Sequence, residues 1–153
     1  MEIQTKDLTV QKVAYIRHMG PYQECGPAWE KLYEWAMKNG IDIKKSLWIG
    51  ASYDDPENTP PEKIRYDACV VIPENFKEDD TVKVQELPGG KYAMAIHMGA
   101  YKNIGETYKK MFSEGLPKAD LSIRMAPCYE YYIGDCTGIP EEKLKTELYI
   151  PIS

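Results

Sequence analysis

Two arrangements of hydrophobic and polar residues follow one another twice along the chain. Apolar and polar positions alternate over 3–8 and 12–19, and again over 82–87 and 91–98, which is the two-residue period of a β-strand. Each pair of predicted strands precedes a stripe of apolar residues at the three- and four-residue spacing of an amphipathic helix. The stripes consist of Trp29, Leu32, Tyr33 and Ala36 in the first case, and of Ile104, Tyr108, Met111 and Phe112 in the second.

The ends of these elements carry ordinary stop signals. Asn39 and Gly40 close the first predicted helix, and Gly115 with Pro117 stops the second. Two further strand candidates follow each helix, at 47–53 and 65–72 in the first half and at 127–133 and 146–152 in the second. The predicted unit is therefore strand-strand-helix-strand-strand, and it occurs twice.

The repeat is also visible in the residues themselves. His18-Met19-Gly20 matches His97-Met98-Gly99 at an offset of 79 residues, and the match extends without a gap on both sides. A repeat of this length usually reflects two copies of one supersecondary unit. We therefore expect a single α+β domain over 1–153, made of repeats at about 1–79 and 80–153. Related by a pseudo-twofold, the two units would join an antiparallel sheet and two helices around a central pocket.

Composition and charge narrow the function. The length of 153 residues and 43% hydrophobic content suit one domain with one core. The net charge of −5 disfavours direct nucleic-acid binding, because phosphate binding needs clustered Lys and Arg. The N-terminal stretch has no apolar signal core, and no long apolar run suggests a membrane span, so a cytoplasmic protein is expected.

The candidate metal ligands are few. The four cysteines have no CxxC spacing and are expected to be free thiols: Cys25, Cys69, Cys128 and Cys136. With only two histidines, no metal cluster has the usual spacing, and neither a metal nor a cofactor is expected. We interpret His18 and His97 as strand-end residues placed alike by the repeat. The alternative, a catalytic or metal-binding pair across the pseudo-twofold, lacks an evident third group.

Glu130 marks a difference between the repeats. At the 79-residue offset it corresponds to Ala51, so one copy has a methyl group where the other has a carboxylate, and Tyr53 corresponds to Tyr132. On an alternating strand, Cys128, Glu130 and Tyr132 share one face. A carboxylate turned toward aromatic rings could neutralise a flat organic cation or, with its pKa raised by desolvation, act as a general base toward water. The alternative is a Glu130 that points into solvent, as glutamates on strands more often do.

Four segments carry a resemblance to a known family. They are YDDPENTPPEKIRYDACVVIP (53–73), GGKYAMAIHMGAY (89–101), PCYEYYIGD (127–135) and TELYIPI (146–152). The chain resembles the gyrase-inhibitor-like small-molecule-binding family, which includes the effector-binding domains of AraC-type and MerR-type multidrug regulators. The resemblance covers essentially the whole chain. It implies the duplicated fold and a pocket for hydrophobic, often cationic, compounds.

The resemblance also implies which residues bind the ligand. The glutamate of the family's P-x-[YF]-E motif lies in the pocket, and here that residue is Glu130. The aromatic residues that match the family are Tyr53, Tyr66 and Tyr149, with Trp48 and Tyr101 nearby. The sequence shows no DNA-binding head of the kind fused to this domain in regulators, so a stand-alone member similar to the DNA gyrase inhibitor is expected.

Three functions follow from this resemblance. The leading hypothesis is a protein without turnover that senses or sequesters a hydrophobic, cationic drug or toxin, with Glu130 as the counter-charge. The second is a hydrolase that opens cyclopropane-bearing alkylating toxins, with Glu130 as its catalytic residue. The third is an inhibitor or protector of DNA gyrase that acts by surface contact.

Overall fold

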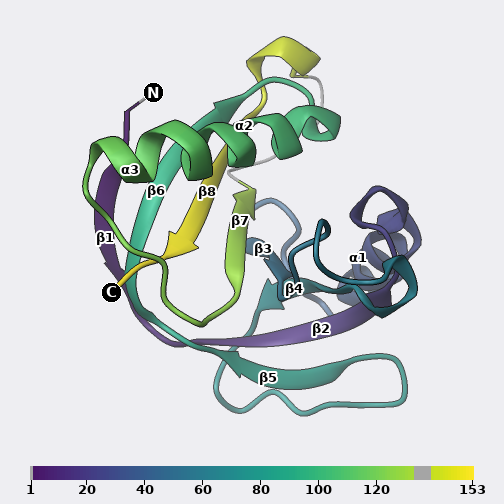
Figure 1. The fold of residues 1–153 in the computed structure, drawn as a ribbon. Helices are drawn as coiled ribbons and strands as arrows, with labels where there is room; N and C mark the ends of the chain where they lie inside the picture. Colours follow the sequence, from purple (N-terminus) through teal and green to yellow (C-terminus); the bar gives the residue numbers. More distant parts are fainter. Residues whose placement is uncertain (1, 133–138) are drawn as a thin grey trace.

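The strands of the computed structural model, which describes residues 2–132 and 139–153, form one curled antiparallel sheet (Figure 1). The strand order is β1-β6-β8-β7-β3-β4-β2-β5. In chain order the strands are β1 (Gln4–Leu8), β2 (Gln11–Met19), β3 (Trp48–Ser52), β4 (Arg65–Val71), β5 (Lys83–Leu87), β6 (Gly90–Met98), β7 (Cys128–Tyr132) and β8 (Lys145–Pro151). Ile133, the last residue of a predicted strand, and Cys136 lie outside the described residues.

The two halves of the chain exchange their first strands. β1 pairs with β6 of the second half, and β5 pairs with β2 of the first half. The bends that follow β1 and β5 meet at close range, because a Cβ on Gly89 would lie 2.2 Å from the carbonyl oxygen of Leu8. The absence of a side chain at Gly89 is therefore what lets the two bent strands pass each other.

Each half carries one helical segment. The short η1 (Tyr22–Glu24) leads into α1 (Gly26–Lys38), and η3 (Tyr101–Asn103) leads into α2 (Ile104–Lys110). The second segment continues through a π-helical stretch, η4 (Met111–Gly115), and ends with α3 (Leu116–Lys118). Two further short turns, η2 (Pro61–Lys63) and η5 (Glu141–Lys143), precede β4 and β8.

The expected stop at Gly115 and Pro117 was wrong, since the helical backbone continues to Lys118. Pro117 lies in the first turn of α3, where its missing N–H costs little. Leu116 is 3% exposed, so burial of its side chain holds this last turn against the sheet.

The offset between the halves changes inside the second helix. β1 and β2 begin 79 residues before β5 and β6, whereas β3 and β4 begin 80 residues before β7 and β8. The 80-residue offset already holds at the helix ends, Lys38 and Lys118. A π-turn accommodates one residue more than an α-turn, so the extra residue falls in Met111–Gly115. The residue that corresponds to Glu130 is therefore Gly50, and the expected match with Ala51 was one position out.

Both helices pack on the same face of the sheet, which we call the helix face. α1 packs against β2 and β4, and a second cluster of buried residues joins Ile104, Met111 and Leu116 to Leu148 and Ile150 of β8. In Figure 1 the helix of the second half crosses β6 and β8, while α1 lies at the other side of the molecule. The seam where β3 meets β7 thus lies between the two helices.

The opposite face has its own core. Tyr92, Tyr129, Tyr131 and Tyr149 pack there with Leu87 and other apolar residues. This arrangement confirms the predicted α+β class with an antiparallel sheet and two helical segments. Within the described residues, no helix has the length and apolar character needed to cross a membrane.

Candidate functional site

Glu130 lies at the centre of the helix face. It is on β7, opposite Gly50 of β3 on one side and Leu148 of β8 on the other. Only 8% of the residue is exposed, so the carboxylate is buried and does not point into solvent. A carboxylate in this position needs hydrogen-bond donors, because an unpaired buried charge is costly.

Two tyrosine hydroxyls donate to the same oxygen of Glu130. Tyr66 of β4 and Tyr132 of β7 each place their hydroxyl 3.2 Å from Oε2. The two hydroxyls are 3.3 Å apart, and Trp29 Nε1 of α1 donates to the Tyr66 hydroxyl at 3.3 Å. The carboxylate is thereby connected to both halves of the sheet and to the first helix.

Gly50 makes room for this network. A Cβ at this position would lie 2.5 Å from Glu130 Oε2 and 2.2 Å from the Tyr66 hydroxyl, both far inside van der Waals contact. The Glu130 side chain therefore leans over β3, into the space that the glycine leaves. At this pair of corresponding positions the first half has a glycine and the second a carboxylate, and the two residues face each other across β3 and β7.

Aromatic rings surround the carboxylate. The Trp29 ring lies 5.4 Å from that of Tyr132 and 6.3 Å from that of Tyr66, both edge-on. Tyr101 contacts Tyr132 at 5.2 Å, and Tyr22 contacts Tyr66 at 5.9 Å. These are separations at which aromatic pairs attract each other, so the rings form one continuous wall.

Burial controls the ionisation of the site. Desolvation raises the pKa of Glu130 to about 7, and the hydrogen bonds from Tyr132 and Tyr66 oppose that rise by stabilising the ionised form. Burial, and then the nearby Glu130, raise the pKa of Cys128 to about 12 and also raise the pKa of Cys25. Both thiols are therefore protonated at neutral pH and poor nucleophiles.

Three of the aromatic residues expected in the site are on the Glu130 face. Tyr66 bonds Glu130 directly, Tyr101 packs on Tyr132, and Trp48 packs on Trp29 with ring centres 6.5 Å apart. The structure places Tyr53 and Tyr149 on the opposite face. Tyr53 donates to Asp67 and Tyr149 to Glu147, so both hydroxyls are hydrogen-bonded on the face away from Glu130.

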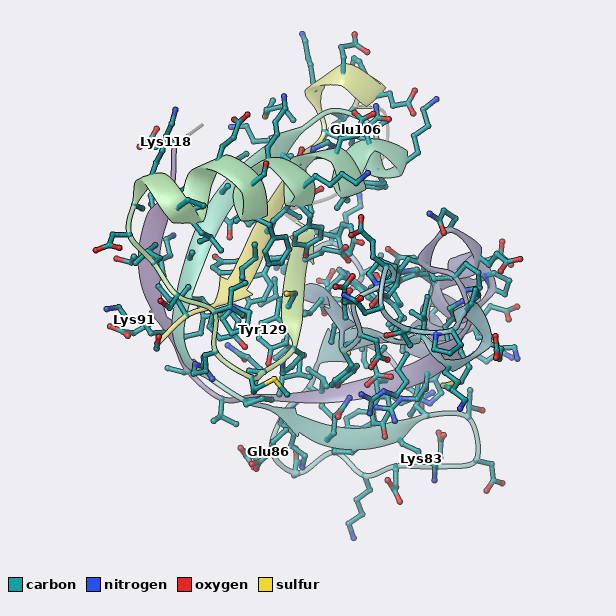
Figure 2. The ribbon with its side chains drawn as sticks, viewed as in Figure 1. Lys83, Glu86, Lys91, Glu106, Lys118 and Tyr129 are labelled. Atoms are coloured by element: carbon teal, nitrogen blue, oxygen red, sulfur yellow. The ribbon has the colours of Figure 1, made fainter. Side chains whose placement is uncertain are left out.

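Figure 2 shows Tyr129, the neighbour of Glu130 in sequence, in the interior of the second half. Its hydroxyl donates to the carbonyl of Pro88, on the face away from the helices. The labelled charged residues of β5 and of the second helix, Lys83, Glu86, Glu106 and Lys118, lie at the periphery. Neighbouring residues of β7 thus serve different faces, as the alternation predicted.

Three neighbours of Glu130 were not included in the expected site. Tyr132 could have been found, since alternation placed it beside Glu130 on one face. Tyr22 could also have been found, because it is the repeat counterpart of Tyr101. Trp29 belonged to a helical stripe, and a stripe does not reveal which strand residues it meets.

The aromatic rings beside Glu130 pack on one another. Two open depressions, of about 630 and 220 Å³, lie elsewhere, between β1 and the second helix, and Glu130 lines neither. The larger depression is lined by Glu2, Gln4, Met94, Ala95, Ile96, Lys110 and Glu114. Tyr101, which packs on Tyr132, is 39% exposed.

The histidines of the repeated HMGxY motif have the same role in both halves. His18 Nε2 lies 2.9 Å from the carbonyl oxygen of Pro21, and His97 Nε2 lies 2.9 Å from that of Ala100. The intervening Gly20 and Gly99 have φ angles of +134° and +118°, which other residues rarely adopt. Four strands separate the two histidines in the sheet, so they form no pair.

No group of three or more potential metal ligands is present among residues 2–132 and 139–153. Cys25, Cys69 and Cys128 are free thiols. Around Glu130 the described residues offer a buried carboxylate, phenolic hydroxyls, aromatic rings and the protonated thiols of Cys25 and Cys128.

The arrangement defines a two-module α+β domain with a buried carboxylate between its helices, a form suited to organic ligands. Known proteins identify the class more closely. The chain belongs to the GyrI-like family, since the pattern of the GyrI-like small molecule binding domain matches residues 1–153. It is 34% identical over 134 residues to a putative transcriptional regulator of Bacillus subtilis, YosT, covering 86% of this chain and 89% of that protein. It is 26% identical over 156 residues to a DNA gyrase inhibitor of Citrobacter koseri, covering 99% and 98%.

Solved structures share the fold at lower identity. The EcmrR C-terminal domain matches with a TM-score of 0.75 at 15% identity, over 99% of this chain and 97% of that one. SAV2435 bound to tetraphenylphosphonium matches at 0.68 and 19%, over 100% and 94%. A hydrolase encoded by lin2189 of Listeria innocua matches at 0.67 and 13%, over 99% and 92%. The same fold thus occurs in the C-terminal domain of EcmrR, in a hydrolase and in a protein that binds an organic cation.

Proposed function

We propose that this protein senses or sequesters a hydrophobic organic cation between its two helices, with Glu130 as the counter-charge. The observation that carries the proposal is the buried Glu130 carboxylate, held by two tyrosine hydroxyls inside a wall of aromatic rings. An aromatic ring face attracts a cation by about 0.5–2 kcal/mol when water is excluded. A carboxylate at the base of the wall adds an attraction that neutral ligands do not receive.

The balance of forces at Glu130 favours a cation over a neutral ligand. Desolvation keeps the pKa of this carboxyl near 7, so the unliganded site holds its negative charge only weakly at neutral pH. A ligand that brings a positive charge removes the cost of the buried anion and stabilises the ionised form. Binding should therefore release a proton when it takes place below pH 7.

The relatives support a small-molecule ligand. The family is defined by a small molecule binding domain, and SAV2435 has been observed with tetraphenylphosphonium, a hydrophobic cation. The rings of Trp29, Tyr101 and Tyr132 would have to move apart to admit such a cation. Their edge-on contacts would be exchanged for contacts with the ligand's own rings.

Two ions of equal shape and opposite charge test the counter-charge. Calorimetric titration with tetraphenylphosphonium and with tetraphenylborate, at pH 8, should show a preference for the cation in the natural protein. Glu130→Gln keeps the shape of the side chain and should reduce that preference at least about tenfold, which corresponds to 1.4 kcal/mol. An equal change in affinity for both ions would reject the counter-charge role of Glu130.

A second candidate function is hydrolysis of a strained electrophile, such as a cyclopropane-bearing alkylating toxin. The observation that favours it is the pKa of Glu130, about 7, which suits a general base at neutral pH. Glu130 would take a proton from water as the water oxygen attacks a ring carbon, and the ring bond would break toward the electron-accepting part of the toxin. Mass spectrometry should then find a product heavier by one water, formed faster than with Glu130→Gln; equal rates would reject this function.

The similarity to a DNA gyrase inhibitor supports a third candidate, a contact with gyrase that does not use the helix-face site. Gyrase supercoiling should then be altered equally by the natural protein and by Glu130→Gln. No effect of either protein on supercoiling would reject this candidate.

A further inference from the structure

One buried hydroxyl in the structure has no hydrogen-bond partner. Thr146, on β8, is 0% exposed, and its Oγ1 is the sole fully buried side-chain nitrogen or oxygen atom without a partner in the part of the chain that the structure describes. Folding removes this hydroxyl from water without replacing its hydrogen bonds, which costs free energy. Such a group in an otherwise well-paired protein is free to bond a hydrogen-bonding group that enters the site.

Thr146 lies beside the Glu130 site. It pairs with Tyr132 of β7 on one side and with His97 of β6 on the other, and residues that pair directly project on the same face. Tyr132 shares the helix face with Glu130 and bonds it. Because Glu130 pairs with Leu148, Thr146 is the diagonal neighbour of Glu130 across β7 and β8. Diagonal neighbours are about 7–8 Å apart, within the span of one drug-sized ligand.

Tyr132 separates the two polar groups. Its hydroxyl reaches Glu130, which leans toward β3, while its backbone lies opposite Thr146 of β8. Its ring contacts Trp29 and Tyr101, the residues that cover the site. A ligand that moves the Tyr132 ring would gain access to the carboxylate on one side and to the hydroxyl on the other.

Comparison of the halves shows that Thr146 is a departure from the repeat. At the 80-residue offset its counterpart is Tyr66, which pairs with His18 as Thr146 pairs with His97. In the first half the Tyr66 ring fills this place and its hydroxyl donates to Glu130. The second half has a short side chain with an unused hydroxyl at the same place, so the site is asymmetric about the seam.

We propose that Thr146 is the second polar anchor of the helix-face site and selects cations that also carry a hydroxyl or another hydrogen-bonding group. This rests on the proposed function, because it assumes that a cation binds at Glu130. The ligand's charge meets Glu130 on the β3 side, and its polar group meets Thr146 Oγ1 on the β8 side. A cation with only hydrocarbon rings leaves the hydroxyl unpaired and gains nothing from it.

Unfolding experiments test the first part without any ligand. Thr146→Val replaces the hydroxyl by a methyl group of similar size and should raise the Tm by about 2–4 °C, because no hydrogen bond is lost. Thr107→Val is the matched control: the Thr107 hydroxyl lies 2.6 Å from His97 Nδ1, so its removal should lower the Tm. A lower Tm for Thr146→Val would show that the hydroxyl is already paired and would overturn the proposal.

Matched ligands test the second part. Tetraphenylphosphonium and the three isomers of (hydroxyphenyl)triphenylphosphonium differ by one hydroxyl at different positions on a ring. The natural protein should prefer at least one hydroxylated isomer, and Thr146→Val should reduce that preference about fivefold, while Thr146→Ser retains it. A preference that is unchanged in Thr146→Val, or no preference in the natural protein, would overturn the proposal.

The two proposals fail in different ways. If the counter-charge role is wrong, Glu130→Gln changes the affinities for the cation and the anion equally, whatever Thr146→Val does. If only the second anchor is wrong, Thr146→Val leaves the ratio of the affinities for hydroxylated and unsubstituted cations unchanged. Glu130→Gln still reduces the preference for cations over anions. If none of the cations binds, the proposed function fails, and the second anchor fails with it.

Discussion

Gly50 and Glu130 lie directly opposite each other where β3 meets β7, and the missing side chain of the first makes room for the carboxylate of the second. We expect Gly50→Ala to destabilise the protein by about 1–3 kcal/mol, because a Cβ would overlap both Glu130 Oε2 and the Tyr66 hydroxyl. Urea unfolding measures the change. Gly105→Ala is the control: nothing lies within 4 Å of its Cβ in α2, so it should be neutral or slightly stabilising. Equal stability of the two variants would contradict this account of Gly50.

The raised pKa of Glu130 predicts a pH-dependent stability. Burial raises this pKa from 4.5 to about 7, so between those values the folded protein holds a proton that the unfolded chain has released. The free energy of unfolding therefore contains a favourable contribution below pH 4.5 that is lost as the pH rises to 7. Glu130→Gln cannot titrate, and its stability relative to the natural protein should increase over this range by on the order of 3 kcal/mol. Urea unfolding at pH 4.5, 6 and 8 measures the difference, and a constant difference would show that this carboxyl is not desolvated.

The two faces of the sheet should respond differently to loss of a tyrosine hydroxyl. Tyr66→Phe removes a donor from ionised Glu130, so we expect the pKa of Glu130 to rise further above 7 and the affinity for tetraphenylphosphonium at pH 7 to fall severalfold. Tyr149→Phe removes only a bond to Glu147 on the opposite face and should leave that affinity much closer to natural. Carbon NMR titration of the Glu130 carboxyl and calorimetry measure the two effects. If Tyr149→Phe lost more affinity than Tyr66→Phe, the ligand would bind on the face opposite the helices, contrary to our proposal.

Asp67 should be important for stability and not for ligand binding. It is 0% exposed on the face away from the helices and accepts hydrogen bonds from Arg17, Tyr53 and Gln85. We expect Asp67→Ala to cost about 2–3 kcal/mol, since three donors lose their acceptor, although the partly exposed Arg17 regains some hydration.

The pair of Asp54 with Arg65, whose side chains are 17% and 45% exposed, provides the control for Asp67. Asp54→Ala should cost less than about 1 kcal/mol, because water screens this ion pair. Thermal unfolding of both variants, with tetraphenylphosphonium titrations of each, checks the prediction. A cost for Asp54→Ala as large as that for Asp67→Ala would contradict the distinction between the pairs.

The periodic pattern was sufficient for the elements but not for their pairing. Alternation located the first two strands of each half, and short apolar and aromatic runs located the other four, which are buried on both faces or nearly so. It could not show that β1 pairs with β6 and β5 with β2, since alternation indicates which residues of a strand share a face and not which strand lies beside it. The repeat suggested two similar units and gave no sign that they exchange strands.

The site was predictable where a residue's own strand determines its position. Glu130 and Tyr132 share a face by alternation, and Tyr66 follows from the family motif. Trp29 was not expected there, because its place above Glu130 depends on how α1 crosses the sheet. The match of Glu130 with Ala51 failed because the 79-residue offset was extended without a gap past the second helix. The π-turn in that helix adds one residue, so the offset at Glu130 is 80.

The exchange of first strands makes the two halves interdependent. A fragment ending before β5 would leave β2 with a bare hydrogen-bonding edge and β1 with nothing to lie against, a combination that invites association with other chains. Each half of the chain therefore supplies an outer strand to the other half. Glu130, where the halves meet, stays buried only while both halves remain folded together.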